Sequence, residues 1–160
     1  MTYVPVPDLV RVQAAPDGAW AEPALVSVSV SCLPDGDGLA IVVEGDAVSR
    51  VHLRWRRGLP ADVLVLGDAW ERTYGDVAWR TVRPERAHPW MIVVHSATSG
   101  SWGAGVDVRT GSFAAWTVDA AGVSLWLDVP AGADADPVRL AVCERRRPVR
   151  ARRDPLLLSP

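Results

Sequence analysis

Short apolar segments that alternate with polar residues, separated by glycine and proline turns, restrict the fold of this chain most. Residues 26–32 alternate strictly as VSVSVSC, and Val51, Leu53 and Trp55 alternate with histidine and arginine. Alternation places apolar side chains on one face of a strand and polar ones on the other, so we expect His52 on the wet face. No window of a dozen residues keeps the apolar spacing that a helix requires.

The clearest hairpin joins residues 113–118 to residues 123–129 through the turn at 119–122. Trp116 lies on its first arm and Trp126 on its second, and we expect the two indoles to pack near each other. Six further strands are expected at 39–43, 62–66, 77–82, 90–95, 106–108 and 138–143.

Residues 100–105 (GSWGAG) are rich in glycine and are interpreted as a connection that presents Trp102 at the rim of a sheet. With this connection excluded, roughly nine or ten short strands follow one another with turn signals between them. The pattern predicts an all-β fold, an antiparallel β-sandwich of supersandwich-like form.

The composition is that of one globular domain followed by a basic segment. The chain has 160 residues, of which 49% are hydrophobic and 22% charged. We expect a β-sandwich over 1–140 and an arginine- and proline-rich tail or truncated linker over 141–160. That tail carries six arginines, but the preceding part is acidic and would repel phosphates, so a solvated tail is favoured over a nucleic-acid arm.

No apolar run is long enough for a membrane helix, and the N-terminus shows no export signal, so a cytoplasmic protein without membrane or nucleic-acid partners is expected. Cys32 and Cys143 are interpreted as buried thiols, with a disulfide as the alternative. The three histidines, His52, His88 and His95, lack metal-ligand spacing and lie beside no nucleophile signature. We therefore expect no metal, no cofactor and no catalytic residue.

Residues 67–80 gather two tryptophans, a tyrosine and three carboxylates between two apolar strands. An aromatic ring packs against the C–H face of a sugar, and a carboxylate accepts hydrogen bonds from sugar hydroxyls. Most of the eight tryptophans are expected in the core, but Trp70 is expected to be exposed. The predicted substrate-binding residues are Asp68, Trp70, Glu71 and Trp102. For the two acids, turn capping and an ion pair are the simpler alternative.

Several motifs together resemble the N-terminal β-domain of α-galactosidase-like glycoside hydrolases, the family that includes raffinose synthases. They are LGDAWER at 66–72, YGD at 74–76 and GVSLWLDV at 122–129, within a resemblance that covers about residues 50–140. The resemblance implies a large β-sandwich that precedes a catalytic (β/α)₈ barrel, for which this chain has no room. It implies that Asp68 and Trp70 help to bind a terminal galactose, while Glu71 and Arg72 brace the loop.

The expected function is therefore a non-catalytic domain that supports galactoside binding at a barrel active site absent from this chain. One alternative is a free-standing carbohydrate-binding module, in which Trp70, Trp79 or Trp102 forms the platform. Another is a structural or assembly domain whose tryptophans are all in the core. In that case an exposed sheet edge pairs with a second copy to form a homo-oligomer.

Overall fold

A computed structural model describes residues 6–15, 17–21, 27–32, 38–44, 48–67, 78–106, 113–129 and 138–145. For 27–32, 38, 43–44 and 138–145 it describes the backbone alone. This part of the chain forms thirteen strands in two antiparallel sheets and contains no helix. The predicted all-β, sandwich-like fold is confirmed, with more strands than the nine or ten expected.

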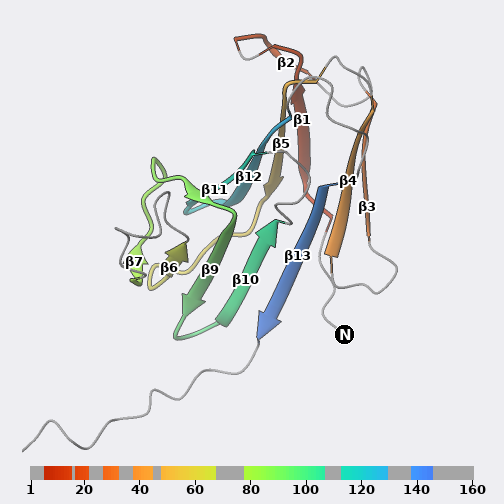
Figure 1. Cartoon of the computed structure of the whole chain (residues 1–160). Helices are drawn as coiled ribbons and strands as arrows, with labels where there is room; N and C mark the ends of the chain where they lie inside the picture. Colours follow the sequence, from red (N-terminus) through yellow and green to blue (C-terminus); the bar gives the residue numbers. More distant parts are fainter. Residues whose placement is uncertain are drawn as a thin grey trace, which may run out of the picture.

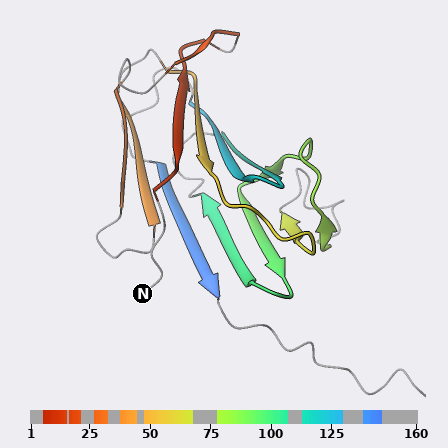
Figure 2. The same ribbon diagram turned by 180° about the vertical axis from the view of Figure 1, so that it is seen from behind.

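The two sheets form separate layers (Figures 1 and 2). The six-stranded sheet contains, in order across the sheet, β2 (Trp20–Ala21), β1 (Leu9–Gln13), β5 (Arg50–Trp55), β12 (Gly122–Asp128), β11 (Phe113–Asp119) and β8 (His88–Pro89). The seven-stranded sheet contains β3 (Ser27–Cys32), β4 (Gly38–Glu44), β13 (Val138–Arg145), β10 (Gly100–Val106), β9 (Met91–Ser96), β6 (Leu64–Gly67) and β7 (Arg80–Thr81).

Alternate side chains of both sheets meet in one hydrophobic core. On β5 the buried residues are Val51, Leu53 and Trp55, in agreement with the alternation seen in the sequence. His52 lies on the opposite face, as predicted, where it is half-buried. Both sheets supply fully buried residues to the same cluster, among them Leu125 and Leu127 from β12, Leu39 and Ile41 from β4, and Ile92 from β9.

The hairpin of β11 and β12 forms as predicted, but its two tryptophans do not pack together. Trp116 lies opposite Leu125, whereas Trp126 lies opposite Ala115. Neighbouring positions on a strand point to opposite faces. Trp116 is therefore in the core, at 1% exposure, while Trp126 is on the outer surface. The expected contact between these indoles is wrong because the register places them one position apart.

The glycine-rich segment is also different from the prediction, because Gly100–Val106 is the regular strand β10 and lies between β13 and β9. Trp102 is consequently half-buried on an interior strand and packs against the core, rather than standing at a rim. No close contact requires glycine at positions 103 and 105, since a Cβ at either would lie at an ordinary van der Waals distance from its neighbours.

Trp90 connects the two sheets at a backbone position that residues other than glycine adopt rarely, with φ of 60°. Its N–H donates to the carbonyl of Ala114 in the six-stranded sheet, and its own carbonyl accepts the N–H of Val106 in the other sheet at 2.9 Å. The same carbonyl accepts Trp116 Nε1 at 3.1 Å. The chain thus passes from β8 to β9, and from one layer to the other, at Trp90.

The last described strand crosses the expected domain boundary at residue 140. β13 pairs with β10 as far as Arg145, which lies opposite Ser101, and Ala141 lies opposite Gly105. Residues 141–145 are therefore part of the seven-stranded sheet, and this pairing argues against assigning them to a separate tail. The side chain of Cys143 on this strand, like that of Cys32 on β3, lies outside the described part, so the prediction of buried thiols stays a prediction.

Candidate functional site

Side chains that point away from the core of the six-stranded sheet form a polar and aromatic surface, which we call the outer face. Strand register sets its rows: Arg11 lies opposite His52, and His52 lies opposite Trp126. In the next row Gln13 lies between Trp20 and Arg50. The outer face comprises Leu9, Arg11, Gln13, Trp20, Arg50, His52, Arg54, Phe113, Ala115, Thr117, Asp119, Ser124, Trp126 and Asp128.

Three rings from three strands form an aromatic cluster at the centre of the outer face. His52 of β5 stacks on Trp126 of β12 with ring centroids 3.9 Å apart and planes 4° apart. Trp20 of β2 meets both rings in edge-on geometry, at 5.9 Å from His52 and 5.7 Å from Trp126. Trp20 is 36% exposed. Trp20 therefore presents apolar ring surface to solvent, beside the half-buried stacked pair of His52 and Trp126.

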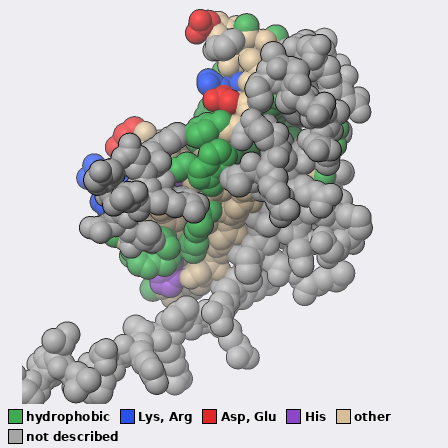
Figure 3. All heavy atoms as spheres, viewed as in Figure 1, with side chains coloured by type: hydrophobic (Ala, Val, Ile, Leu, Met, Phe, Trp, Pro, Cys, Tyr) green, Lys and Arg blue, Asp and Glu red, His purple; other side chains and the backbone are tan. Residues whose placement is uncertain are grey.

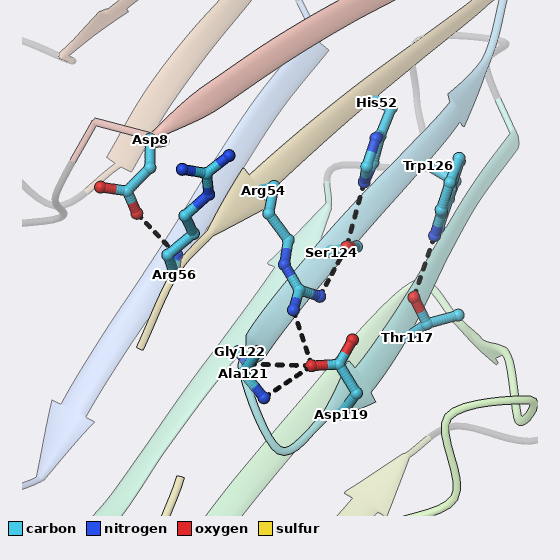
Figure 4. A network of polar contacts seen from close by, with 10 residues as sticks. All are labelled: Asp8, His52, Arg54, Arg56, Thr117, Asp119, Ala121, Gly122, Ser124 and Trp126. Atoms are coloured by element: carbon cyan, nitrogen blue, oxygen red, sulfur yellow. Dashed lines mark hydrogen bonds and ion pairs between the residues drawn. The ribbon is translucent and has the colours of Figure 1, made fainter. Parts of the chain in front are cut away.

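Hydrogen bonds hold two rings of this cluster, His52 and Trp126, in place (Figure 4). Trp126 Nε1 donates to Thr117 Oγ1 at 3.0 Å. The hydroxyl oxygen of Ser124, a buried residue, accepts Arg54 Nη1 at 3.0 Å and lies 3.0 Å from His52 Nε2. Because Ser124 accepts from arginine, its own proton is free to be donated to an unprotonated Nε2. The hydroxyl oxygen can also accept a second hydrogen bond, so the geometry is compatible with a neutral imidazole that carries its proton on either nitrogen.

The aspartate at the hairpin turn anchors the arginine of that network. Asp119 Oδ1 accepts Arg54 Nη2 at 2.6 Å and also the backbone N–H groups of Ala121 and Gly122. The hydrogen bond from Arg54 is the largest cause of the lowered pKa of Asp119. The Arg54 side chain is only 14% exposed, so the ion pair has a partly desolvated cation and a defined geometry.

The pKa of His52 is lowered to about 4, mainly by burial and also by the positive charges of Arg54 and Arg11. The imidazole is therefore neutral at pH 7, and it stacks on Trp126 as an uncharged ring. A neutral ring also suits the hydrogen bond to Ser124 described above. Protonation would place a third positive charge near Arg54 and Arg11.

We expect the stability of the domain to fall as the pH is lowered from 6.5 toward 4. In this window an unfolded histidine takes up a proton while folded His52, with its pKa of about 4, remains neutral, so acid favours the unfolded state. The expected contribution of His52 is about 2 kcal/mol once solvent screening is allowed for. Urea unfolding at several pH values between 4 and 7.5 measures it.

The matched variant for this measurement is His52→Gln, which keeps a polar side chain and cannot titrate. The pKa of buried His88 is also lowered, mainly by burial, and this residue contributes to the same pH window in both proteins. The difference between the two curves therefore isolates His52. Parallel curves for the variant and the unaltered protein would contradict the assignment.

Three of the four predicted sugar-binding residues, Asp68, Trp70 and Glu71, lie outside the described residues. Their roles stay predictions. The fourth, Trp102, lies on β10 of the other sheet and packs against the core, so it is not part of the outer face. Trp79, which the module alternative named, is 46% exposed beside the seven-stranded sheet and lies 5.6 Å from the ring of His95.

The described exposed surface of the seven-stranded sheet mixes apolar and polar side chains. Met91 is 40% exposed, and Val93, Leu64 and Leu66 are half-buried on the same side. Figure 3, seen from the same direction as Figure 1, shows hydrophobic side chains reaching the surface of the molecule. His95 and Ser101 lie on this side as well, with His95 Nδ1 2.7 Å from Ser101 Oγ, so it offers hydrogen-bonding groups beside its apolar residues.

The sequence interpretation did not identify the aromatic cluster as a site. Alternation placed His52 on the wet face, and the same rule applied to residues 123–129 places Trp126 opposite to Leu125 and Leu127. Those signals were available in the sequence. Trp20 gave no such signal, because its strand is only two residues long and has no periodic pattern.

Neither a metal-ligand cluster nor a membrane-spanning helix occurs in the part of the chain that is described. Within it, no group of three or more histidine, cysteine, aspartate or glutamate side chains is arranged to hold a metal ion. The same residues include no helix with the length and apolar character needed to cross a membrane.

Comparison with known proteins identifies no relative of this chain: no family model matches it, and no curated protein or solved structure does either. The geometry of the outer face is therefore what supports a function.

Proposed function

We propose that this chain is a non-catalytic carbohydrate-binding domain and that its outer face binds the sugar. The observation that carries the proposal is the aromatic cluster of Trp20, His52 and Trp126 on a sheet face, in which hydrogen bonds hold His52 and Trp126 before any ligand arrives. A preformed apolar surface lowers the entropy lost on binding.

The groups around the cluster match the two chemical faces of a sugar. Indole rings pack against the C–H side of a pyranose, while hydroxyl groups need donors and acceptors at the margin. Arg50 supplies donors and Asp128 supplies acceptors beside the cluster. The two form an ion pair whose side chains are 37% and 46% exposed. An exposed ion pair contributes little to folding and remains accessible to a ligand.

The carboxylates of the outer face support binding rather than hydrolysis. A glycosidase needs one carboxyl group that is protonated at working pH and a second that is ionised. Asp119 and Asp128 are each paired with an arginine, and the hydrogen bond from Arg54 lowers the pKa of Asp119. A lowered pKa is unsuited to a general acid.

Trp20→Ala and Trp126→Ala should each weaken saccharide binding by about tenfold to a hundredfold, the effect expected of a central tryptophan in a binding surface. Calorimetric titration with soluble oligosaccharides of galactose, glucose, mannose and xylose measures the affinity. The fold of each variant is checked by circular dichroism.

The matched control is Trp79→Ala, which removes an exposed tryptophan beside the other sheet and should leave the affinity unchanged. Loss of binding in Trp79→Ala, with full binding in the two outer-face variants, would move the platform to the seven-stranded sheet. Absence of binding to every saccharide tested would sink the proposed function.

The narrower proposal is that the domain supports galactoside binding in an α-galactosidase-like hydrolase, with Asp68, Trp70 and Glu71 as contacts. What supports it is the resemblance of the motifs at 66–72 and 122–129. Titration with galactosides distinguishes it: this chain alone should then bind weakly, and the binding that remains should fall in Asp68→Ala and Trp70→Ala but not in Trp20→Ala.

The assembly alternative depends on a sheet edge. Among the described edge strands, β2, β7 and β8 have two residues each, whereas β3 has six and is the one long enough for extended pairing. The assembly alternative therefore predicts a homo-oligomer in which β3 pairs with a strand of a second copy. Analytical sedimentation over a range of protein concentrations tests whether the chain associates.

A further inference from the structure

The outer face carries one cation that its own aspartates do not neutralise. Arg50 is paired with Asp128, and Arg54 with Asp119. Arg11 is exposed, and no hydrogen bond or ion pair joins it to another residue in the described part of the chain. With His52 neutral, three arginines and two aspartates leave this surface one positive charge.

Arg11 lies next to the aromatic cluster. It is opposite His52 across the pairing of β1 and β5, and His52 is opposite Trp126 across the next pairing. Its charge is among those that lower the pKa of His52, which places the guanidinium within electrostatic reach of that ring. A ligand ring packed on the cluster would therefore hold its substituents close to Arg11.

We infer that the saccharide bound by the outer face is acidic, a hexuronic acid unit whose ring packs on Trp20 and Trp126 and whose carboxylate pairs with Arg11. The inference rests on the proposed function and specifies its ligand class. A hexuronic acid has an apolar ring face like that of a neutral sugar, together with one carboxylate at C6. The planar guanidinium fork of arginine matches a carboxylate with two parallel hydrogen bonds.

The charge pattern favours one carboxylate per binding unit over a densely charged polyanion. Asp119 and Asp128 stand on the same face, and the whole chain has a formal net charge of −2 at pH 7. The repeated phosphates of a polyanion would be repelled by Asp119 and Asp128. A single carboxylate bound beside Arg11 would be attracted by its positive charge without that repulsion.

Matched sugars that differ only at C6 test the inference. Methyl α-D-galacturonide is compared with methyl α-D-galactopyranoside, and methyl α-D-glucuronide with methyl α-D-glucopyranoside, by NMR titration of the full chain at low ionic strength. In at least one pair the uronide should bind about tenfold more tightly than the neutral sugar, and added salt should reduce the difference.

Arg11→Gln should lower the uronide affinity to that of the neutral sugar, while Arg11→Lys should keep part of the preference. Arg83→Gln removes an exposed arginine between β7 and β8 and should leave the affinities for the uronide and the neutral sugar unchanged. Because Arg11 and Arg83 are exposed, all three variants should fold, which circular dichroism checks.

Equal affinity for the uronide and the neutral sugar in both pairs would overturn the inference, as would a preference that survives Arg11→Gln. In either case binding that is still lost in Trp20→Ala leaves the proposed function standing. Absence of binding to all four sugars and to the oligosaccharides would overturn both together.

Discussion

Trp116→Ala should lower the free energy of unfolding by about 3–5 kcal/mol, a large share of the stability of a domain of this size. Trp116 is 1% exposed and its ring lies 6.0 Å from that of Trp55 within the core. Its Nε1 donates to the carbonyl of Trp90, which also accepts the N–H of Val106. The substitution removes a large apolar volume and a hydrogen bond at the point where the chain passes between the sheets.

Trp126→Ala is the control, because the two tryptophans are on the same hairpin and face opposite ways. Its loss removes the stacking on His52 and the hydrogen bond to Thr117 but opens no core cavity, so the expected cost is about 1 kcal/mol. Urea unfolding compares the two variants. Equal losses of stability, or a larger loss for Trp126→Ala, would contradict the assignment of Trp116 to the core.

These two residues also show how far the sequence predicts the fold. Alternation at β5 correctly placed Trp55 in the core and His52 outside it, and the turn at 119–122 correctly predicted the hairpin. Proximity along the hairpin was not enough to predict which indoles meet. The faces follow from strict counting of positions on each strand, and Trp116 and Trp126 are offset by one.

The segments that sequence interpretation misassigned have their structure imposed by neighbours. Gly103 and Gly105 are typical of a loop by composition, yet β10 is extended because β9 and β13 supply hydrogen-bonding partners on both sides. β2 and β8 are too short to carry any periodic signal and exist because they pair with β1 and β11. Local pattern cannot reveal an element whose cause is a distant strand.

The aromatic cluster could be predicted only in part for the same reason. Trp20, His52 and Trp126 come from β2, β5 and β12, and they meet because β5 lies between β1 and β12 in the sheet. That strand order is a property of the whole fold. Composition instead drew attention to residues 67–80, where the tryptophans and acids are adjacent in the sequence.

Gly122→Ala should destabilise the domain by about 2–4 kcal/mol, although it adds a single methyl group. Gly122 begins β12 with φ of 149°, a conformation that residues with a side chain rarely adopt. A Cβ there would clash with the carbonyl oxygen of Trp55 and lie 2.9 Å from the backbone nitrogen of Arg57; these are backbone atoms at the end of β5 and cannot rotate away.

The clash at Gly122 lies between β5 and β12, the two strands whose register stacks His52 on Trp126. Relief requires β12 to move away from β5, so Gly122→Ala should also weaken saccharide binding at the outer face, in any population that remains folded.

Gly58→Ala is the matched control, because a Cβ at Gly58 has no atom within 4 Å; its stability and affinity should be unchanged. Urea unfolding and calorimetric titration of both variants measure the two effects. A Gly122→Ala protein of full stability would contradict the close backbone approach, and one that is destabilised yet binds normally would show that the β5–β12 register does not set the binding surface.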